Sequence, residues 1–212
     1  MPMSLVLKRL HIEGKKFVTS EELKIYTRNA KIKYEVLVRY FETKGYLVRI
    51  FRGIFYVKSA EEIELGRINL SHLELVARGL EIKKIRNWYF GLHTALKLNN
   101  MTHESFEVEE VISDLLFRAK PIKIANYKFK FVKLSNKLFG FGIENKNGLK
   151  ISDPEKTILD FIYLWKQNGL PEEKIIPDIS DWAKGLSSKK LKLYAENYPA
   201  SVRNMSTRVV QR

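Results

Sequence analysis

Hydrophobic and polar positions near the start of the chain follow the periods of two helices and a β-hairpin. Thr19-Ser20 followed by Glu21-Glu22 favours a helix start, because a hydroxyl accepts from free backbone N–H groups and acids suit the helix dipole. Gly45 suits the left-handed end of a helix, and Arg52-Gly53 suits a two-residue hairpin turn. The pattern predicts helix 21–26, a break at 28–30, helix 31–44, strand 46–51 and strand 54–57.

A further amphipathic helix is expected over 4–13, where it would pack under the helix pair. Helix, turn, helix and hairpin in this order describe a winged helix-turn-helix. In that module the second helix enters a DNA major groove and the hairpin flanks it. The opening segment therefore predicts a DNA-binding domain.

Residues near the start of such a second helix reach base edges, and Lys or Arg side chains hold phosphates. The alternative is a solvated basic helix face with charged residues protecting the edge of the hairpin. We favour DNA contact for seven residues: Lys31, Lys33, Tyr34 and Arg39 from the expected recognition helix, and Arg49, Arg52 and Lys58 from the hairpin.

The polar stretch 59–70 is expected to connect two domains, a winged domain over 1–60 and an α+β domain over 61–212. Period-two segments and helix caps mix in the second, so the fold class is α+β with a larger mixed helix-and-sheet domain after the winged one. The expected elements are helices 72–82, 88–98 (capped by Asn87), 154–169 (capped by Asp153) and 187–197, and strands 106–108, 122–124, 127–131, 139–143 and 149–151 with a turn at Asn147-Gly148. Segment 111–117 fits either a short helix or a strand. Pro171 and Pro177 are expected to divide the remainder of the chain into short helices.

Charge points to a polyanionic partner. The 212 residues carry a formal net charge of +14, and residues 1–60 hold 13 Lys+Arg against 5 Asp+Glu, a balance of +8. Each phosphate that a cation neutralises releases counterions, so an excess of this size suits nucleic acid. The chain opens without the apolar run of a signal peptide and has no run of ~18 apolar residues, so we expect a cytoplasmic protein that does not engage a membrane.

Little in the sequence suggests catalysis. With no cysteine, disulfides and thiolate metal sites are excluded, and the four histidines show no metal-ligand spacing. Gly140-Phe141-Gly142 is not followed by a phosphate-loop helix. Asp153-Pro154-Glu155-Lys156 superficially resembles the cluster of a metal-dependent nuclease, but it fits a helix cap better. We expect no catalytic residues, no metal and no cofactor.

Three ordered segments resemble the AbiEi-type antitoxins, the regulators of type IV toxin–antitoxin systems. They are KGYLVRIFRGIFYVK (44–58), WYFGLHTALKLNNMTH (88–103) and ISDPEKTILDFIY (151–163), so the resemblance covers about residues 17–198. In that family a glycine precedes the hairpin and an Arg-Gly pair forms its turn, which places Arg52 and Gly53 at the wing turn here. Pro154, Glu155, Lys156, Leu159 and Asp160 match a helix motif whose role we interpret as structural. Lys31 to Tyr34 matches no family motif.

The resemblance implies a transcriptional regulator that binds repeats in its own promoter, represses its operon and opposes a nucleotidyltransferase toxin. It also implies that the second domain carries antitoxic activity and contributes to DNA binding. Two alternatives remain open: a winged module that binds RNA or protein without an antitoxin role, and a metal-dependent nuclease. The sequence predicts neither the operator nor the oligomeric state.

Overall fold

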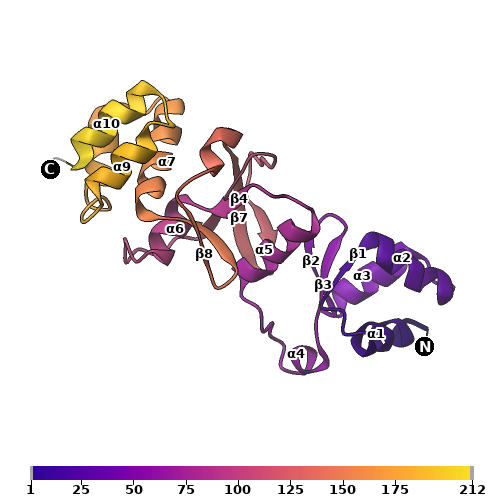
Figure 1. The fold of residues 1–212 in the computed structure, drawn as a ribbon. Coiled ribbons are helices and arrows are strands. Elements are labelled where there is room, and N and C mark those ends of the chain that lie inside the picture. The colour runs from indigo at the N-terminus through magenta and orange to yellow at the C-terminus, as the bar shows by residue number, and fades with distance from the viewer. Residues whose placement is uncertain (1, 211–212) are drawn as a thin grey trace. The chain divides into compact units, whose positions relative to one another are not determined.

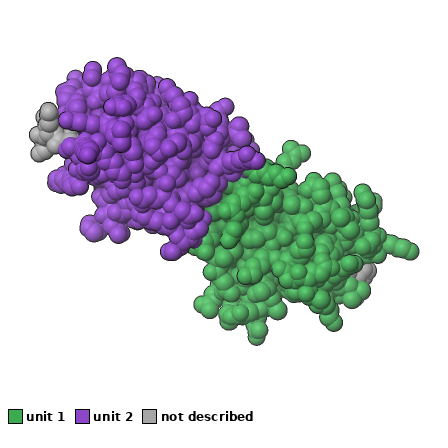
Figure 2. Space-filling view, viewed as in Figure 1, with its two compact units in different colours: residues 1–84, 123–126 green, residues 85–122, 127–212 purple. Residues whose placement is uncertain are grey.

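The structure, a computed structural model, describes residues 2–210 and confirms the α+β class. Within these residues the strands form two sheets (Figure 1). The chain divides into two compact units, residues 1–84 with 123–126 and residues 85–122 with 127–212 (Figure 2). No helix in the described part of the chain is long and apolar enough to cross a membrane.

The first unit has the elements of a winged helix-turn-helix. In order these are α1 (Pro2–Ile12), β1 (Phe17–Thr19), α2 (Ser20–Asn29), α3 (Tyr34–Thr43), β2 (Leu47–Phe51), β3 (Ile54–Val57), α4 (Ala60–Glu64) and α5 (His72–Ile82). The three strands form an antiparallel sheet in the order β1-β3-β2. Helices α1, α2 and α3 share one core with β3, formed by Leu10, Leu23, Leu37, Phe41 and Phe55.

Side-chain caps set the starts of the helices that were predicted correctly in this unit. Thr19 caps α2 through a capping box with Glu22, Ser71 caps α5 in the same way with Glu74, and α5 has the expected bounds. The polar stretch 59–70 is not wholly a connection, because Ser59 caps the short helix α4.

Residue 60, the expected domain boundary, lies inside the first unit. Helix α5 belongs with the hairpin, against which it packs closely at Gly79. A Cβ added at Gly79 would lie 2.8 Å from side-chain carbons of both Ile50 and Phe51.

The second unit contains most of a mixed sheet with the strand order β6-β7-β5-β4-β9-β8. The strands of this sheet are β4 (Trp88–Phe90), β5 (Val108–Ser113), β7 (Tyr127–Lys133), β8 (Ile143–Lys146), β9 (Leu149–Ser152) and β6 (Ile122–Ile124), of which residues 123–124 are grouped with the first unit. β5 pairs in parallel with β7, β4 pairs in parallel with β9, and the pairs β4–β5 and β8–β9 are antiparallel. The β8–β9 hairpin turns at Asn147-Gly148, as predicted.

Helices complete this unit: α6 (Leu92–Leu98), the 3-10 turn η1 (Asn136–Phe139), α7 (Pro154–Gln167), α8 (Glu172–Ser180), α9 (Ser188–Ala195) and α10 (Ala200–Val210). Helix α7 packs against α6, α8, α9 and α10 (Figure 1). It begins as predicted, with Asp153 as cap and Pro154 in the first turn.

Several expected elements of the second unit are wrong. The helix expected over 88–98 is two elements, since Trp88–Phe90 is a fully buried strand between β5 and β9 and α6 starts only after Gly91. The strand expected over 139–143 starts only at its last residue, Ile143, as β8, because η1 ends at Phe139 and Gly142 takes a left-handed conformation with φ 62°. A Cβ at Gly142 would lie 2.7 Å from the Cβ of Lys156.

Three other differences are smaller. Segment 111–117, which fitted either a short helix or a strand, begins within strand β5, and this strand ends at Ser113. The strand expected over 106–108 lies mostly before β5, which starts at Val108. Pro177 does not divide a helix but lies inside α8. Residues Ala200–Val210 form α10, which the sequence did not predict.

Candidate nucleic-acid interface

The turn between α2 and α3 is fixed by backbone hydrogen bonds. The N–H of Lys31 donates to the carbonyl of Arg28 at 3.1 Å, and the N–H of Ile32 donates to that of Thr27 at 2.9 Å. These two bonds are those of a Schellman motif, which requires a left-handed residue after the helix. Lys31 occupies that position with φ 54°. The helix expected over 31–44 therefore starts later, at Tyr34, and Lys31 lies in the turn before it.

The N-terminus of α3 is left open by its own sequence. Lys33 is the N-cap residue, and its side chain makes no capping hydrogen bond. The first N–H groups of a helix have no intrahelical partner and carry a partial positive charge. Lys31 and Lys33 are both exposed beside this helix end. The arrangement offers backbone donors and two ammonium groups to an anion at one place.

A hollow of about 380 Å³ lies between α3 and the hairpin turn. Four of the seven residues predicted from the sequence line it: Tyr34 and Arg39 from α3, Arg49 from β2, and Arg52 from the turn. Ser20 and Lys24 of α2, with Glu35, Val38, Glu42 and Gly53, complete the lining. Cations outnumber acids in this set, four to two, which gives the hollow a positive balance.

Arg49 connects α3 to the hairpin. Its Nε lies 2.8 Å from Oε1 of Glu42 and its Nη2 lies 3.0 Å from Oε2 of the same carboxylate. The guanidinium carbon also lies 5.1 Å from the ring centroid of Phe55. The hydrogen bond with Glu42 raises the pKa of Arg49, and the carboxylate offsets its charge. Arg49 is thus oriented by its partners and only partly available to a phosphate.

Tyr34 forms the wall of the hollow at the start of α3. Burial raises the pKa of its hydroxyl, and the ammonium of Lys24 lies 5.6 Å from its ring centroid. Lys24 was not among the predicted residues. Its exposed position on α2 carries no signal in the sequence, because only the fold brings α2 next to the start of α3.

Lys58 does not join the hollow. It follows β3 at the end of the hairpin opposite the Arg52-Gly53 turn, where its N–H donates to the carbonyl of Tyr46 at 3.0 Å. Its own carbonyl lies 2.8 Å from Nε2 of His11. The structure therefore gathers Tyr34, Arg39, Arg49 and Arg52, places Lys31 and Lys33 at the adjoining helix end, and separates Lys58 from both.

The residues considered for a nuclease are occupied within the second unit. Asp153 Oδ1 accepts from the backbone N–H of Lys156 at 2.8 Å, and its Oδ2 lies 2.9 Å from Nζ of Lys190. Oε2 of Glu155 lies 3.1 Å from the same Nζ. Lys156 is fully buried against Asp160. Among residues 2–210 no group of three or more His, Asp or Glu is arranged to hold a metal.

No protein-family model and no curated protein sequence matches the chain. Its fold is similar to that in the crystal structure of the RV2827C protein from Mycobacterium tuberculosis, with a TM-score of 0.63 at 16% sequence identity. The likeness covers 99% of this chain and 76% of the other. At this identity it establishes a shared fold over the length of the chain.

Proposed function

We propose that the first unit binds double-stranded DNA and that the protein is a sequence-specific transcriptional regulator of the cytoplasm. The observation that carries the proposal is the hollow between α3 and the hairpin turn. It draws Tyr34, Arg39, Arg49 and Arg52 into one surface from three separate elements. A winged helix-turn-helix places this surface against a major groove and its flanking backbone.

Affinity in this proposal comes mainly from residues around α3. Helix α3 carries one cation, Arg39, and two acids, Glu35 and Glu42. The net charge of the helix is therefore negative and does not attract phosphate. Lys31 and Lys33 before the helix and Arg52 in the turn supply the positive charge. Each phosphate that they neutralise releases counterions and makes binding salt-dependent.

Discrimination between DNA sequences falls to the exposed side chains of α3. Arg39 is exposed and can donate two parallel hydrogen bonds to a guanine edge. Val36 is 37% exposed one turn earlier and can contact a thymine methyl group.

Fluorescence anisotropy tests this proposal with three labelled probes: the duplex upstream of the protein's own gene, a scrambled duplex of equal composition, and a structured RNA of equal length. We expect tighter binding to the upstream duplex than to either control at moderate salt. Equal affinity for all three probes would indicate that the protein binds polyanions in general and does not recognise a DNA sequence. Preference for the RNA would favour a winged RNA-binding module instead.

We further propose that the regulator is an autorepressing antitoxin that binds repeats in its own promoter and opposes a nucleotidyltransferase toxin. The support is the resemblance of three ordered segments, 44–58, 88–103 and 151–163, to the AbiEi-type antitoxins. The test is whether a nucleotidyltransferase gene adjoins this one and whether co-expression of this protein restores growth to cells that express it. A regulator without such a neighbour would retain the DNA-binding proposal and lose the antitoxin one.

A further inference from the structure

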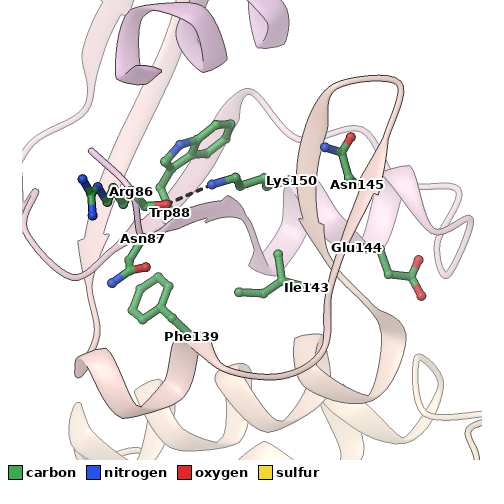
Figure 3. A pocket seen from close by; sticks show the side chains of 8 residues that line it. All are labelled: Arg86, Asn87, Trp88, Phe139, Ile143, Glu144, Asn145 and Lys150. Atoms are coloured by element: carbon green, nitrogen blue, oxygen red, sulfur yellow. Dashed lines mark hydrogen bonds between the residues drawn. The ribbon is translucent and has the colours of Figure 1, made fainter. Parts of the chain in front are cut away.

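A cavity of about 230 Å³ opens in the second unit beside the start of β4 (Figure 3). It has no part in the proposed DNA interface. Its lining comes from segments far apart in the chain, namely Arg86, Asn87 and Trp88, then Phe139, then Ile143, Glu144 and Asn145 of β8, and Lys150 of β9. The β8–β9 hairpin, η1 and the residues before β4 thus converge around one space.

Lys150 places a positive charge on the wall. Its Nζ donates to the backbone carbonyl of Arg86 at 2.9 Å and lies 5.5 Å from the ring centroid of Trp88. These two contacts hold the ammonium group at the edge of the cavity, next to the ring of Trp88 (Figure 3). An ammonium group has three protons, so donors remain for a ligand.

Asn87 places a hydrogen-bond acceptor on the opposite wall. Its Nδ2 donates to Oδ2 of Asp114 at 2.8 Å and to Oδ1 of Asn136 at 2.7 Å. Two acceptors facing the same atom assign it as the amide nitrogen, and both amide protons are then used. Its Oδ1 lies on the side of the cavity in Figure 3, and no group among residues 2–210 donates to it.

The remaining walls are flat or apolar. Trp88 is buried, and Phe139 and Ile143 are half-buried with their side chains turned into the cavity (Figure 3). Glu144, the next residue of β8, points away from it (Figure 3). The cavity therefore combines aromatic and aliphatic walls with one fixed acceptor and one fixed cation.

We propose that this cavity binds a nucleobase, carried by a free nucleotide or by a single-stranded nucleic acid. A purely apolar ligand would leave Oδ1 of Asn87 and the Lys150 ammonium without partners. A simple anion would satisfy Lys150 but would face the Asn87 oxygen. A planar heterocycle with an N–H donor and a ring acceptor satisfies both groups and stacks on the half-buried ring of Phe139.

Calorimetric titration of the full chain tests the site with five probes: AMP, CMP, adenosine, inorganic phosphate and a single-stranded hexanucleotide. We expect a nucleotide and its nucleoside to bind and inorganic phosphate not to bind. Tighter binding of the hexanucleotide than of either monophosphate would identify the single strand as the source. Binding of phosphate alone, or of none of the probes, would overturn the proposal.

Ile143→Trp should fill the cavity without removing either polar contact and should weaken nucleotide binding at least tenfold. Lys137→Met is the control, because it removes an ammonium group from an exposed residue of η1 that does not line the cavity, and it should bind as the unaltered protein does. Lys150→Met keeps an unbranched aliphatic side chain, removes the ammonium, and should weaken binding even if Ile143→Trp does not fold. Unchanged binding in folded Ile143→Trp or Lys150→Met would contradict the site. Binding of duplex DNA should be the same in all three variants.

Discussion

Ser20 and Gly53 join the helix-turn-helix to the tip of the hairpin. The backbone N–H of Ser20 donates to the carbonyl of Gly53 at 2.9 Å. Gly53 has φ 78°, and a Cβ added to it would lie 2.8 Å from Oγ of Ser20. The contact holds the backbone of the hairpin turn against α2 and so positions Arg52, which lines the hollow. The shape of the hollow therefore depends on a turn conformation that glycine adopts without strain.

Gly53→Ala should lower the free energy of unfolding by about 1–2 kcal/mol, because an alanine with positive φ is strained. Part of that loss should disappear in a Ser20→Ala background, where the close hydroxyl is absent. Gly45→Ala is the control, since Gly45 also has positive φ but a Cβ there meets nothing within 4 Å. Urea unfolding of the single and double variants measures the coupling. Equal losses at Gly53 in both backgrounds would show that the Ser20 contact is unimportant.

Arg52→Ala should weaken binding to all duplexes by a similar factor, because a turn residue contacts phosphate and not base edges. The slope of log affinity against log salt should become less steep by about 0.9, the value for one phosphate contact. Anisotropy titrations at four salt concentrations measure both effects. Arg67→Ala, which removes an exposed arginine from the segment between α4 and α5, is the control and should change neither.

Elements that rest on local chemistry could be predicted from the sequence. Thr19 with Glu22, Asp153 with Pro154, and Asn147-Gly148 each fix a helix start or a turn within a few residues. The hairpin strands were also predicted within one residue of their bounds, because β-rich runs flank an Arg-Gly turn.

Elements set by contacts between distant segments could not be predicted. Trp88–Phe90 continues the helical pattern of the residues after it, and it becomes a strand because β5 and β9 lie on either side. Gly142 appears in a period-two segment, but its φ of 62° follows from its close approach to Lys156. In the candidate site the same limit applies to Lys24, which reaches the hollow only through the packing of α2 beside α3.

Glu62 should make the first unit sensitive to acid. Burial acts to raise the pKa of its carboxyl, but hydrogen bonds from the backbone N–H groups of Asn69 and Ser59 outweigh burial and hold the pKa below its ordinary value of 4.5. A carboxylate whose pKa is lowered by folding stabilises the protein above the unfolded pKa. This contribution is lost as the pH falls below about 4.5 and through the folded pKa.

Glu62→Gln should therefore cost about 1–3 kcal/mol at pH 7, and its deficit relative to the unaltered protein should shrink as the pH falls below about 4.5. Urea unfolding across this pH range measures the difference. Glu61→Gln changes an exposed residue of the same short helix and should stay within about 0.5 kcal/mol at every pH. A Glu62→Gln deficit that does not vary with pH would show that packing and not charge is responsible.

Lys156 and Asp160 form an ion pair with both side chains fully buried, at 3.2 Å, and the hydroxyls of Tyr89 and Tyr198 also donate to Asp160. Lys156→Met should destabilise the second unit by about 3–5 kcal/mol, since it leaves a buried carboxylate without its cation. Adding Asp160→Asn should restore part of the loss. Lys184→Ala, at an exposed pair with Asp181, should cost less than about 1 kcal/mol. A double variant no more stable than Lys156→Met would show that lost packing is the larger effect.

Glu42→Gln should strengthen DNA binding, because it removes a negative charge from the hollow and releases Arg49 from a carboxylate that accepts from both Nε and Nη2 of its guanidinium. Glu35→Gln removes the same charge from the same hollow, and no ion pair of Glu35 exists among the described residues. The two variants therefore separate loss of charge from release of Arg49. If Arg49 reaches the DNA backbone, the affinity gain of Glu42→Gln should exceed that of Glu35→Gln and should vanish in an Arg49→Ala background. Equal gains in both variants would assign the effect to charge alone. A loss of affinity in Glu42→Gln would mean that the Glu42 contact is needed to orient Arg49 toward the phosphate.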